Sequence, residues 1–265
     1  LNAGYSYKYF GKSQGVSVCG FIDESHRLFY STVIHPSERE AAYVIDGLMH
    51  NDVVKSDIHS TDTHGYNEMI FGATHLLGIS FAPRIKNFTK QQLYCFDRPS
   101  LMKSKGYRIL PKKRINTTII QENWDDILRF IATIKLKRCT ASQMFKRLSS
   151  YALQHPLYTA LKQFGCIVKT LFLLKYIDDV ELRQMIEKQL NKIESANKFG
   201  KAVYHGNNQE FLVSTKEEQL IAEGCKRLIE NAIICWNYMY LTNRLCSINS
   251  QSEKSNLLAR IKQSS

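Results

Sequence analysis

The sequence lacks the cysteine spacing of a zinc site or of a disulfide framework. Its seven cysteines are scattered, their number is odd, and no two of them are separated by two residues. This usage is typical of reduced thiols in the cytosol. The sequence also lacks an apolar run whose length approaches the roughly 18 residues of a membrane helix. The longest, at about 167–177, is interrupted by Lys169 and Lys175. We therefore expect a cytoplasmic protein without a membrane segment.

Acidic residues are scarce relative to basic ones. The 265 residues contain 24 Asp and Glu against 36 Lys and Arg, for a net charge of +12. A globular protein this basic usually binds a polyanion, and nucleic acid is the first expectation. The hydrophobic fraction of 44% suffices for a core in one large domain or two smaller ones. An initiator Met and a signal peptide pattern are missing, so we expect a piece of a longer polypeptide or a truncated gene product.

The first third of the chain alternates between strand and helix patterns. Runs of β-branched and aromatic residues indicate strands, and an early acidic cluster after Pro36 indicates the start of a helix. The predicted order is strand 14–22, strand 28–34, a helix from Pro36, strand 56–61, helix 66–77 and strand 79–85. This order predicts a mixed α/β layer fold.

The composition changes after Arg84. Residues 84–114 contain ten basic residues and one acid, Asp97, and predict a polar connection with short strands that is either a solvated loop or a DNA-binding groove. From Asn123 onward the spacing of apolar residues is helical. The predicted helices begin near residues 124, 140, 156, 179 and 217. Trp124 and Trp236 are expected in the core, and the tail after Ser247 is expected to fray.

Two acidic residues in unusual settings are candidates for catalysis. Asp62 ends a predicted strand and is followed at once by a Gly turn and a helix, so its carboxylate lies beside helix amides that have no intrahelical partner. A simple helix cap is the more ordinary role for such an Asp. Glu194 lies 194 − 62 = 132 residues further on, in an Asn-Lys-x-Glu-x-x-Asn context, where a solvated helix face is the ordinary reading. Together they suggest metal-dependent phosphodiester chemistry.

Polar side chains near these acids are candidates for contact with DNA phosphates or with metal-bound water. Helical spacings of three, four and seven residues place several of them on the face of Glu194. The candidates are His64, Arg84, Asn191, Lys192, Asn197, Lys198 and Lys201. His59 and His64 flank Asp62 and raise the alternative of a transition-metal site, for which the sequence offers no third ligand.

Several segments in order resemble the catalytic region of the Tn-three family of bacterial transposases, which are replicative enzymes of the DDE class. The resemblance spans essentially the whole chain, and its specificity lies in the order of the motifs rather than in any one of them. The segments are 38–48, 61–65, 81–85, 124–129, 190–194 and 236–240.

The resemblance implies an α/β fold with an RNase H-like mixed sheet flanked by helices, and a large, mainly helical insertion before the helix of the catalytic Glu. The implied division is 1–85 for the RNase H-like core, 86–180 for the insertion, 181–246 for C-terminal helices that complete the core, and 247–265 for a flexible tail. The family's first catalytic Asp lies on a strand just before the segment that is here 7–11. The first strand of the core and this Asp are therefore expected to be missing.

The resemblance also implies a site and a reaction. Two Mg²⁺ ions, for which Mn²⁺ can substitute, are held by two Asp and one Glu. The second Asp corresponds to Asp62 and the Glu to Glu194. Ile193 and Ala196 depart from the Gly and Arg that are common in the family. The implied reaction is cleavage of transposon ends at their terminal inverted repeats and strand transfer into target DNA.

The implied setting is a homodimer on DNA in the bacterial cytoplasm, associated with the nucleoid. Because the first Asp is missing, we expect this chain alone to bind DNA without cutting it. The alternative is a truncated, inactive DNA-binding remnant of such a transposase. A ribonuclease or resolvase of the same fold is a weaker third reading, since it needs no large helical block between Asp62 and Glu194.

Overall fold

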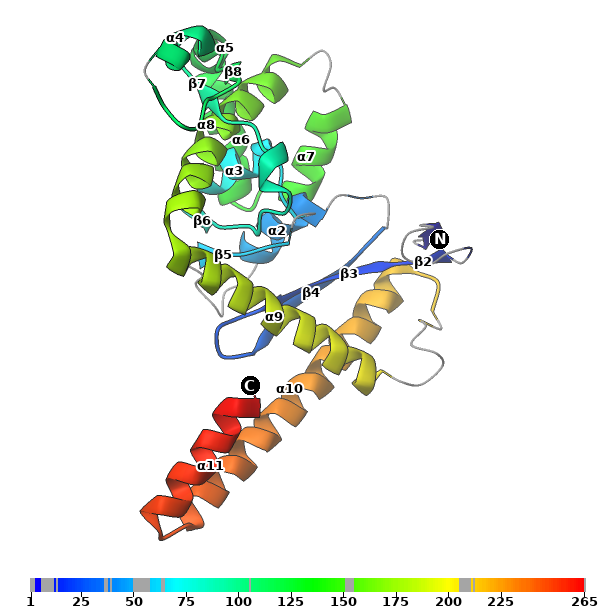
Figure 1. Ribbon diagram of the computed structural model, residues 1–265. Helices are drawn as coiled ribbons and strands as arrows, with labels where there is room; N and C mark the ends of the chain where they lie inside the picture. The colour runs from blue at the N-terminus through cyan, green and yellow to red at the C-terminus, as the bar shows by residue number, and fades with distance from the viewer. Residues whose placement is uncertain are drawn as a thin grey trace.

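The computed structural model shows a mixed α/β protein in which helices predominate (Figure 1). It describes residues 3–5, 12, 14–35, 38, 40–49, 58–62, 65–104, 106–150, 155–204, 211 and 213–264. At the N-terminal end, β1 (Gly4–Tyr5) pairs antiparallel with β2 (Gln14–Gly15).

The predicted hairpin is confirmed. β3 (Ser17–Ile22) and β4 (Leu28–Ile34) pair antiparallel, with Ser17 opposite Ile34 and an irregularity in register before Ile22. The connecting turn is held by Asp23, whose carboxylate accepts hydrogen bonds from the backbone N–H groups of Ser25 and Arg27 at 2.9 and 2.8 Å. Such an Asx-type turn satisfies the backbone locally and fixes the register of the hairpin.

A parallel strand pair follows. β5 (Ile58–His59) and β6 (Ser80–Phe81) are joined by α3 (Glu68–Leu76), which is capped by the Asn67 side chain. Both strands are shorter than the predicted 56–61 and 79–85, and residues 51–57 lie outside the described part. The pairing continues past β5, because the N–H of Ala82 donates to the carbonyl of His59 and that of Arg84 to the carbonyl of Thr61.

The main core lies where α3 crosses α8 (Pro156–Asp178). The two helices touch at Gly72 and Gly165, where a Cβ on Gly165 would lie 1.7 Å from the carbonyl oxygen of Glu68. Beside this contact, the Lys169 ammonium pairs with the Glu68 carboxylate at 2.9 Å. By length and composition alone, α8 could span a bilayer. Core helices of soluble proteins often meet the same criterion.

Three helices pack around this crossing. They are α2 (Glu40–Met49), α6 (Trp124–Lys135) and α7 (Ala141–Ser150). The sequence predicts the first of them from Pro36, but Glu38 lies in a bend and the helix is described from Glu40. The buried Asp46 carboxylate on α2 accepts hydrogen bonds from the N–H groups of Ala141 and Ser142, at 2.5 and 3.1 Å, and so caps α7 from a distant part of the chain.

The basic connection after Arg84 contains short elements, as expected. They are a 3-10 turn η1 (Phe88–Lys90), β7 (Tyr94–Cys95), α4 (Pro99–Ser104), β8 (Lys113–Arg114) and α5 (Thr117–Glu122). β7 and β8 pair in parallel. Helices α4 to α8 lie within the segment 86–180, and its status as an insertion stays a prediction.

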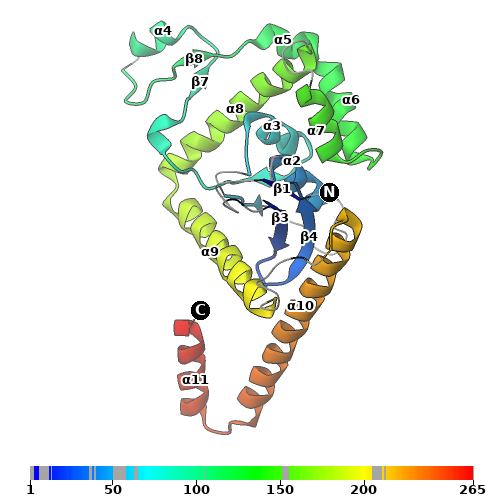
Figure 2. The ribbon, with the colours of Figure 1, turned by 90° about the vertical axis from the view of Figure 1, so that its right-hand side faces the viewer.

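Helices make up most of the described C-terminal third. α9 (Val180–Val203) follows α8, and α10 (Lys216–Ser247) docks on the hairpin, where the Asn231 amide bonds to both backbone groups of Leu28. Beyond this contact α10 extends away from the body, and α11 turns back (Figures 1 and 2). The expected frayed tail instead contains this helix, α11 (Gln251–Ser264). Trp236, expected in the core, is 64% exposed, so that prediction was wrong.

The sheets remain separate within the described residues. Hydrogen bonds join β1 to β2, β3 to β4, β5 to β6 and β7 to β8, and no further strand pairing is described. The mixed α/β class is therefore confirmed. The continuous RNase H-like sheet that the resemblance implies does not form among the strands that the structure describes.

Candidate active site

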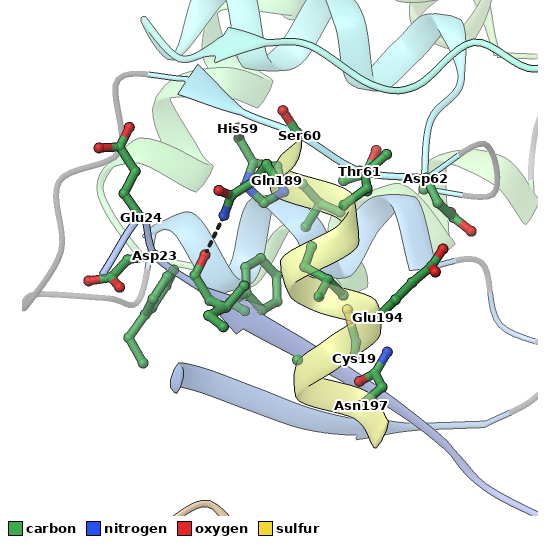
Figure 3. Close-up of a pocket in the computed structure, with 18 of the residues that line it drawn as sticks. Cys19, Asp23, Glu24, His59, Ser60, Thr61, Asp62, Gln189, Glu194 and Asn197 are labelled. Atoms are coloured by element: carbon green, nitrogen blue, oxygen red, sulfur yellow. Dashed lines mark hydrogen bonds between the residues drawn. The ribbon is translucent and has the colours of Figure 1, made fainter. Parts of the chain in front are cut away.

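A pocket of about 680 Å³ lies between the hairpin and the parallel strand pair (Figure 3). Its lining comes from β3 and the hairpin turn, from β5 and the residues that follow it, from the start of α2, and from the middle of α9. Both acidic candidates, Asp62 and Glu194, belong to this lining.

The strand pair and a tight turn position Asp62. The carbonyl of the preceding Thr61 is bonded to the segment after β6, which fixes the chain up to this point. The N–H of Gly65 then donates to the carbonyl oxygen of Asp62 at 3.2 Å. A Cβ at Gly65 would lie 2.8 Å from the Cβ of Thr61, so the turn needs glycine here. Thr63 and His64 lie outside the described residues, and the predicted DNA contact of His64 stays a prediction.

The position of Glu194 depends on the corner between α8 and α9. Asp179 caps α9 by accepting a hydrogen bond from the N–H of Leu182 at 2.8 Å. The Arg183 guanidinium donates to the carbonyls of Tyr176 and Ile177 at the end of α8, each at 2.6 Å. These bonds satisfy groups that helix ends leave unpaired, and they set the direction of α9.

Contacts with the rest of the protein then hold α9 against the pocket. Leu182, Ile186 and Leu190 form a buried cluster with Ala82. The Gln189 amide donates to the carbonyl of Ile22 at 3.3 Å. As a result, the carboxylates of Asp62 and Glu194 project into the same side of the pocket in Figure 3, although 132 residues separate them.

The other predicted contacts divide into two groups. Asn197 and Arg84 line the pocket, and the Arg84 guanidinium also pairs with Glu187 at 3.3 Å. Lys192 instead donates to the carbonyl of Glu24 in the hairpin turn at 2.9 Å. The remaining candidates on α9 are exposed and outside the pocket lining, so their contact with DNA stays a prediction. They are Asn191, Lys198 and Lys201.

Two pocket residues were not assigned a role from the sequence. Burial, followed by the nearby carboxylates of Glu40 and Asp62, raises the pKa of the Cys19 thiol to about 12. Cys19 therefore remains a protonated thiol, which is a poor nucleophile. The same effect shows that Glu40 lies near Cys19, and Glu40 also lines the pocket. Its position within the 38–48 motif was the one sequence signal that could have indicated this.

His59 belongs to the apolar layer beneath the pocket. Its ring stacks on Phe21 at 5.5 Å and on Phe81 at 6.3 Å between centroids. Burial lowers the pKa of His59 to about 4, so the imidazole is neutral at physiological pH. Its Nε2 atom is buried and makes no hydrogen bond within the described part of the protein.

The donor set fits a divalent cation in part. Carboxylate oxygens are the ligands that Mg²⁺ and similar hard cations prefer, and Asp62 and Glu194 present them to one space. Within the described ranges, no group of three or more His, Cys, Asp or Glu side chains is close enough to hold one ion. The described residues therefore offer a pair of donors rather than a complete set.

Comparison with known proteins identifies the family of this chain. Residues 1–263 match the family model of the Tn3 transposase DDE domain. The chain is 37% identical to the transposase of transposon Tn1546 from Enterococcus faecium, over 88% of this chain and 24% of that protein. It is 33% identical to the transposase of Tn501 from Pseudomonas aeruginosa, over 88% and 23%. For the transposase of transposon gamma-delta from Escherichia coli (strain K12), the identity is 28%, over 96% and 25%.

This chain thus carries a DDE domain of the transposase type. It belongs to the Tn3 transposase family, and the predicted resemblance is confirmed. It spans about a quarter of the length of these relatives.

Proposed function

We propose that this chain is the catalytic part of a DNA transposase that cuts transposon ends at terminal inverted repeats and joins them to target DNA. The observation that supports this most is the convergence of Asp62 and Glu194 on one pocket in a member of the Tn3 family. The location that suits this activity is the bacterial cytoplasm, at the nucleoid, and the active form is a homodimer on DNA.

Asp62 and Glu194 would hold the metal. When bound, Mg²⁺ ions, for which Mn²⁺ can substitute, would activate the attacking oxygen and stabilise the leaving oxygen of an in-line displacement at phosphorus. The two side chains reach the site from separate elements, a strand end and the middle of a helix, so their separation is set by the packing of α9. Asn197 lies one helical turn beyond Glu194 on the same pocket wall, where its amide can hold a phosphate oxygen or a water molecule.

A complete site needs a further acidic donor. Since the described residues supply a pair, the proposed reaction requires a further carboxylate from outside the described residues. We therefore propose that the 265-residue chain binds DNA without cutting it. The alternative function, an inactive DNA-binding remnant, predicts the same behaviour for this chain. The two proposals differ only in whether the longer protein cuts DNA.

DNA binding would depend on the basic surface. Between η1 and α5, the described charged side chains that are exposed are all cationic except Asp97, and they include Lys103, Arg108, Lys112, Lys113 and Arg114. Contacts of this kind release counterions from DNA, so the affinity should fall steeply as salt concentration rises. A weak or salt-insensitive interaction would argue against this surface as the DNA-binding site.

The test compares this chain with a longer version of the protein that includes sequence N-terminal to Leu1. Both are incubated with terminal-repeat DNA and Mg²⁺ or Mn²⁺, and strand cleavage is measured on denaturing gels. We expect cleavage by the longer version alone, and its loss in Asp62→Asn and in Glu194→Gln with DNA binding retained. Cleavage by the short chain that Asp62→Asn abolishes would show that the further donor is not needed. Cleavage that survives both substitutions in the longer protein would refute the assignment of the site.

A further inference from the structure

Residues 86–114 form a projection whose exposed charges are almost all of one sign. β7, α4 and β8 lie at the opposite end of the molecule from α10 and α11 (Figures 1 and 2). Within the described part of the projection, which omits residue 105, the exposed charged side chains are cationic except for Asp97. Such a surface favours a polyanion such as the phosphate backbone of DNA. The exposed cations are Lys86, Lys90, Arg98, Lys103, Arg108, Lys112, Lys113 and Arg114.

Large apolar side chains are exposed among these cations. Phe96, Tyr107 and Ile109 are 56%, 57% and 47% exposed. A single exposed apolar side chain is ordinary, but several on one short segment mark a binding surface. Phosphate groups need only the cations, so the exposed rings indicate a ligand that has an apolar face as well as negative charge.

The base of the projection is fixed to the core. Leu93, Cys95 and Ile115 are buried. The N–H of Tyr94 donates to the hydroxyl of Thr170 on α8 at 3.2 Å, and the N–H of Ile115 donates to the carbonyl of Cys95 at 2.8 Å. The strand pair of β7 and β8 is thus held against α8, and it carries the exposed segment between its two strands.

Phe96 follows this anchored strand directly, and the backbone around it is held from both sides. The Nε atom of Arg114 donates to the carbonyl of Phe96 at 2.9 Å. The thiol of Cys95 donates to the carbonyl of Asp97 at 3.2 Å. The backbone that carries the exposed ring is therefore ordered in the absence of a ligand, which lowers the entropic cost of binding one.

An aromatic ring among cations matches an unpaired nucleic-acid strand better than a duplex. In a duplex the faces of the bases are stacked on each other, so a protein reaches phosphates and base edges only. In an unpaired strand each base can stack on an aromatic side chain while Lys and Arg contact the phosphates. Such stacking tolerates any sequence, because every base has a π-face.

We propose that the projection 86–114 binds an unpaired DNA strand, with Phe96 and Tyr107 stacking on bases and the surrounding cations contacting the phosphates. The preference for an unpaired strand over a duplex stands on the exposed side chains. The choice of DNA rests on the proposed function, since cutting strands and joining them elsewhere frees them from their duplex at the point of exchange.

The experiment titrates the 265-residue chain into fluorescently labelled DNA at fixed salt and follows anisotropy. Three ligands are compared, namely an unpaired strand of about 12 nucleotides, an abasic strand of the same length, and the duplex of the same sequence. The abasic strand keeps the phosphates and lacks the bases. We expect the unpaired strand to bind about tenfold more tightly than the abasic strand.

Substitutions separate stacking from charge. Phe96→Ala should weaken binding of the unpaired strand about tenfold and leave the affinities for the duplex and the abasic strand unchanged, and Tyr107→Ala should act in the same way. Lys112→Gln should instead weaken binding of all three ligands and reduce the salt dependence by about one counterion. The matched control is Tyr238→Ala on α10, where the ring is 71% exposed and outside the projection. Circular dichroism confirms that the variants fold.

A direct readout of stacking comes from Phe96→Trp, which keeps an aromatic ring at this position. This variant should retain the affinity for the unpaired strand. Its added fluorescence should be quenched by the unpaired strand and not by the abasic strand, after subtraction of the signal from Trp124 and Trp236 in the parent chain.

Equal binding of the unpaired and abasic strands would overturn this inference, as would a Phe96→Ala variant that weakens strand binding no more than Tyr238→Ala does. It is also overturned if Phe96→Ala leaves DNA binding unchanged and abolishes binding to phosphatidylglycerol vesicles, because the projection would then meet a membrane surface. These results leave the proposed cleavage reaction intact. Conversely, base-dependent binding that needs Phe96, in a protein whose longer version does not cut DNA, would count against the proposed function and support the strand-binding projection.

Discussion

The two candidate carboxylates in the pocket, Asp62 and Glu194, are held in different ways. Asp62 follows a strand pair whose connecting helix, α3, crosses α8 in the largest buried cluster of the protein. Glu194 lies on α9, whose buried side chains include Leu182, Ile186 and Leu190. The first carboxylate is thus fixed by the core. The second depends on how a largely exposed helix docks against the hairpin, which makes assembly of the site sensitive to weak contacts.

The largest effect is expected on the Asp62 side, at the crossing of α3 and α8. Gly165→Ala would place a Cβ 1.7 Å from a backbone oxygen, and the helices would have to separate. We expect a loss of about 3 kcal/mol in the free energy of unfolding, measured by urea denaturation. The matched control is Gly224→Ala on α10, where the Cβ meets no atom within 4 Å. That variant should gain roughly 0.5–1 kcal/mol. Equal behaviour of the two variants would contradict the close crossing.

The next effect concerns the apolar layer beneath Asp62 and its dependence on pH. The pKa of His59 is about 4 in the folded protein, below its ordinary value of 6.5, so the unfolded chain takes up the proton first as the pH falls. Stability should therefore decrease from pH 6.5 down to about pH 4 and level off below, by roughly 3 kcal/mol in total.

The variant His59→Phe keeps an aromatic ring in the stack but cannot titrate. The stability of this variant is measured by urea denaturation from pH 7 to pH 4. It should not show the part of the decline that protonation of His59 causes. His75→Phe, at an exposed position on α3, is the control and should keep it. If His59→Phe shows the same decline as the parent chain, His59 is not buried as a neutral group.

A smaller effect is expected where α2 caps α7. Asp46→Ala removes the acceptor for two N–H groups at the start of α7, one of them in the buried residue Ala141. We expect a loss of about 2 kcal/mol, at the upper end of what helix caps contribute. Asp46→Asn keeps one side-chain acceptor and should lose less. Thermal unfolding of the parent chain and the two variants at one pH ranks their stabilities. Equal stabilities of Asp46→Ala and Asp46→Asn would argue against the capping role.

The smallest effect on stability is expected on the Glu194 side. Lys192→Met removes the bond from α9 to the carbonyl of Glu24, which is exposed to solvent, so the free energy of unfolding should change by less than about 0.5 kcal/mol. If α9 positions Glu194, cleavage by the longer protein should nevertheless fall roughly tenfold to a hundredfold. Lys188→Met, also exposed on α9, is the control. Equal cleavage by both variants would show that the hairpin contact does not position the site.

Local signals in the sequence predicted many of the elements. The β-branched runs and polar turn predicted the hairpin of β3 and β4, and the helical spacing of apolar residues predicted helices beginning near 156 and 179, which are α8 and α9. The motifs also predicted the family. These inferences succeed because turns, caps and hydrophobic periodicity act over a few residues, and because the order of motifs is itself carried by the sequence.

Other features depended on the tertiary structure. The position of Glu40 in the pocket lining and the exposure of Trp236 both involve segments that are distant in sequence or that lack a packing partner within the described residues. Periodicity indicates that a side chain is apolar, but not which surface covers it. The sequence by itself therefore determined the longer helices before Ser247, the hairpin and the acidic candidates. Only the packing of α9 and α10 against the hairpin decided which of these side chains share a pocket and which remain uncovered, because burial is settled by contacts between elements rather than within them.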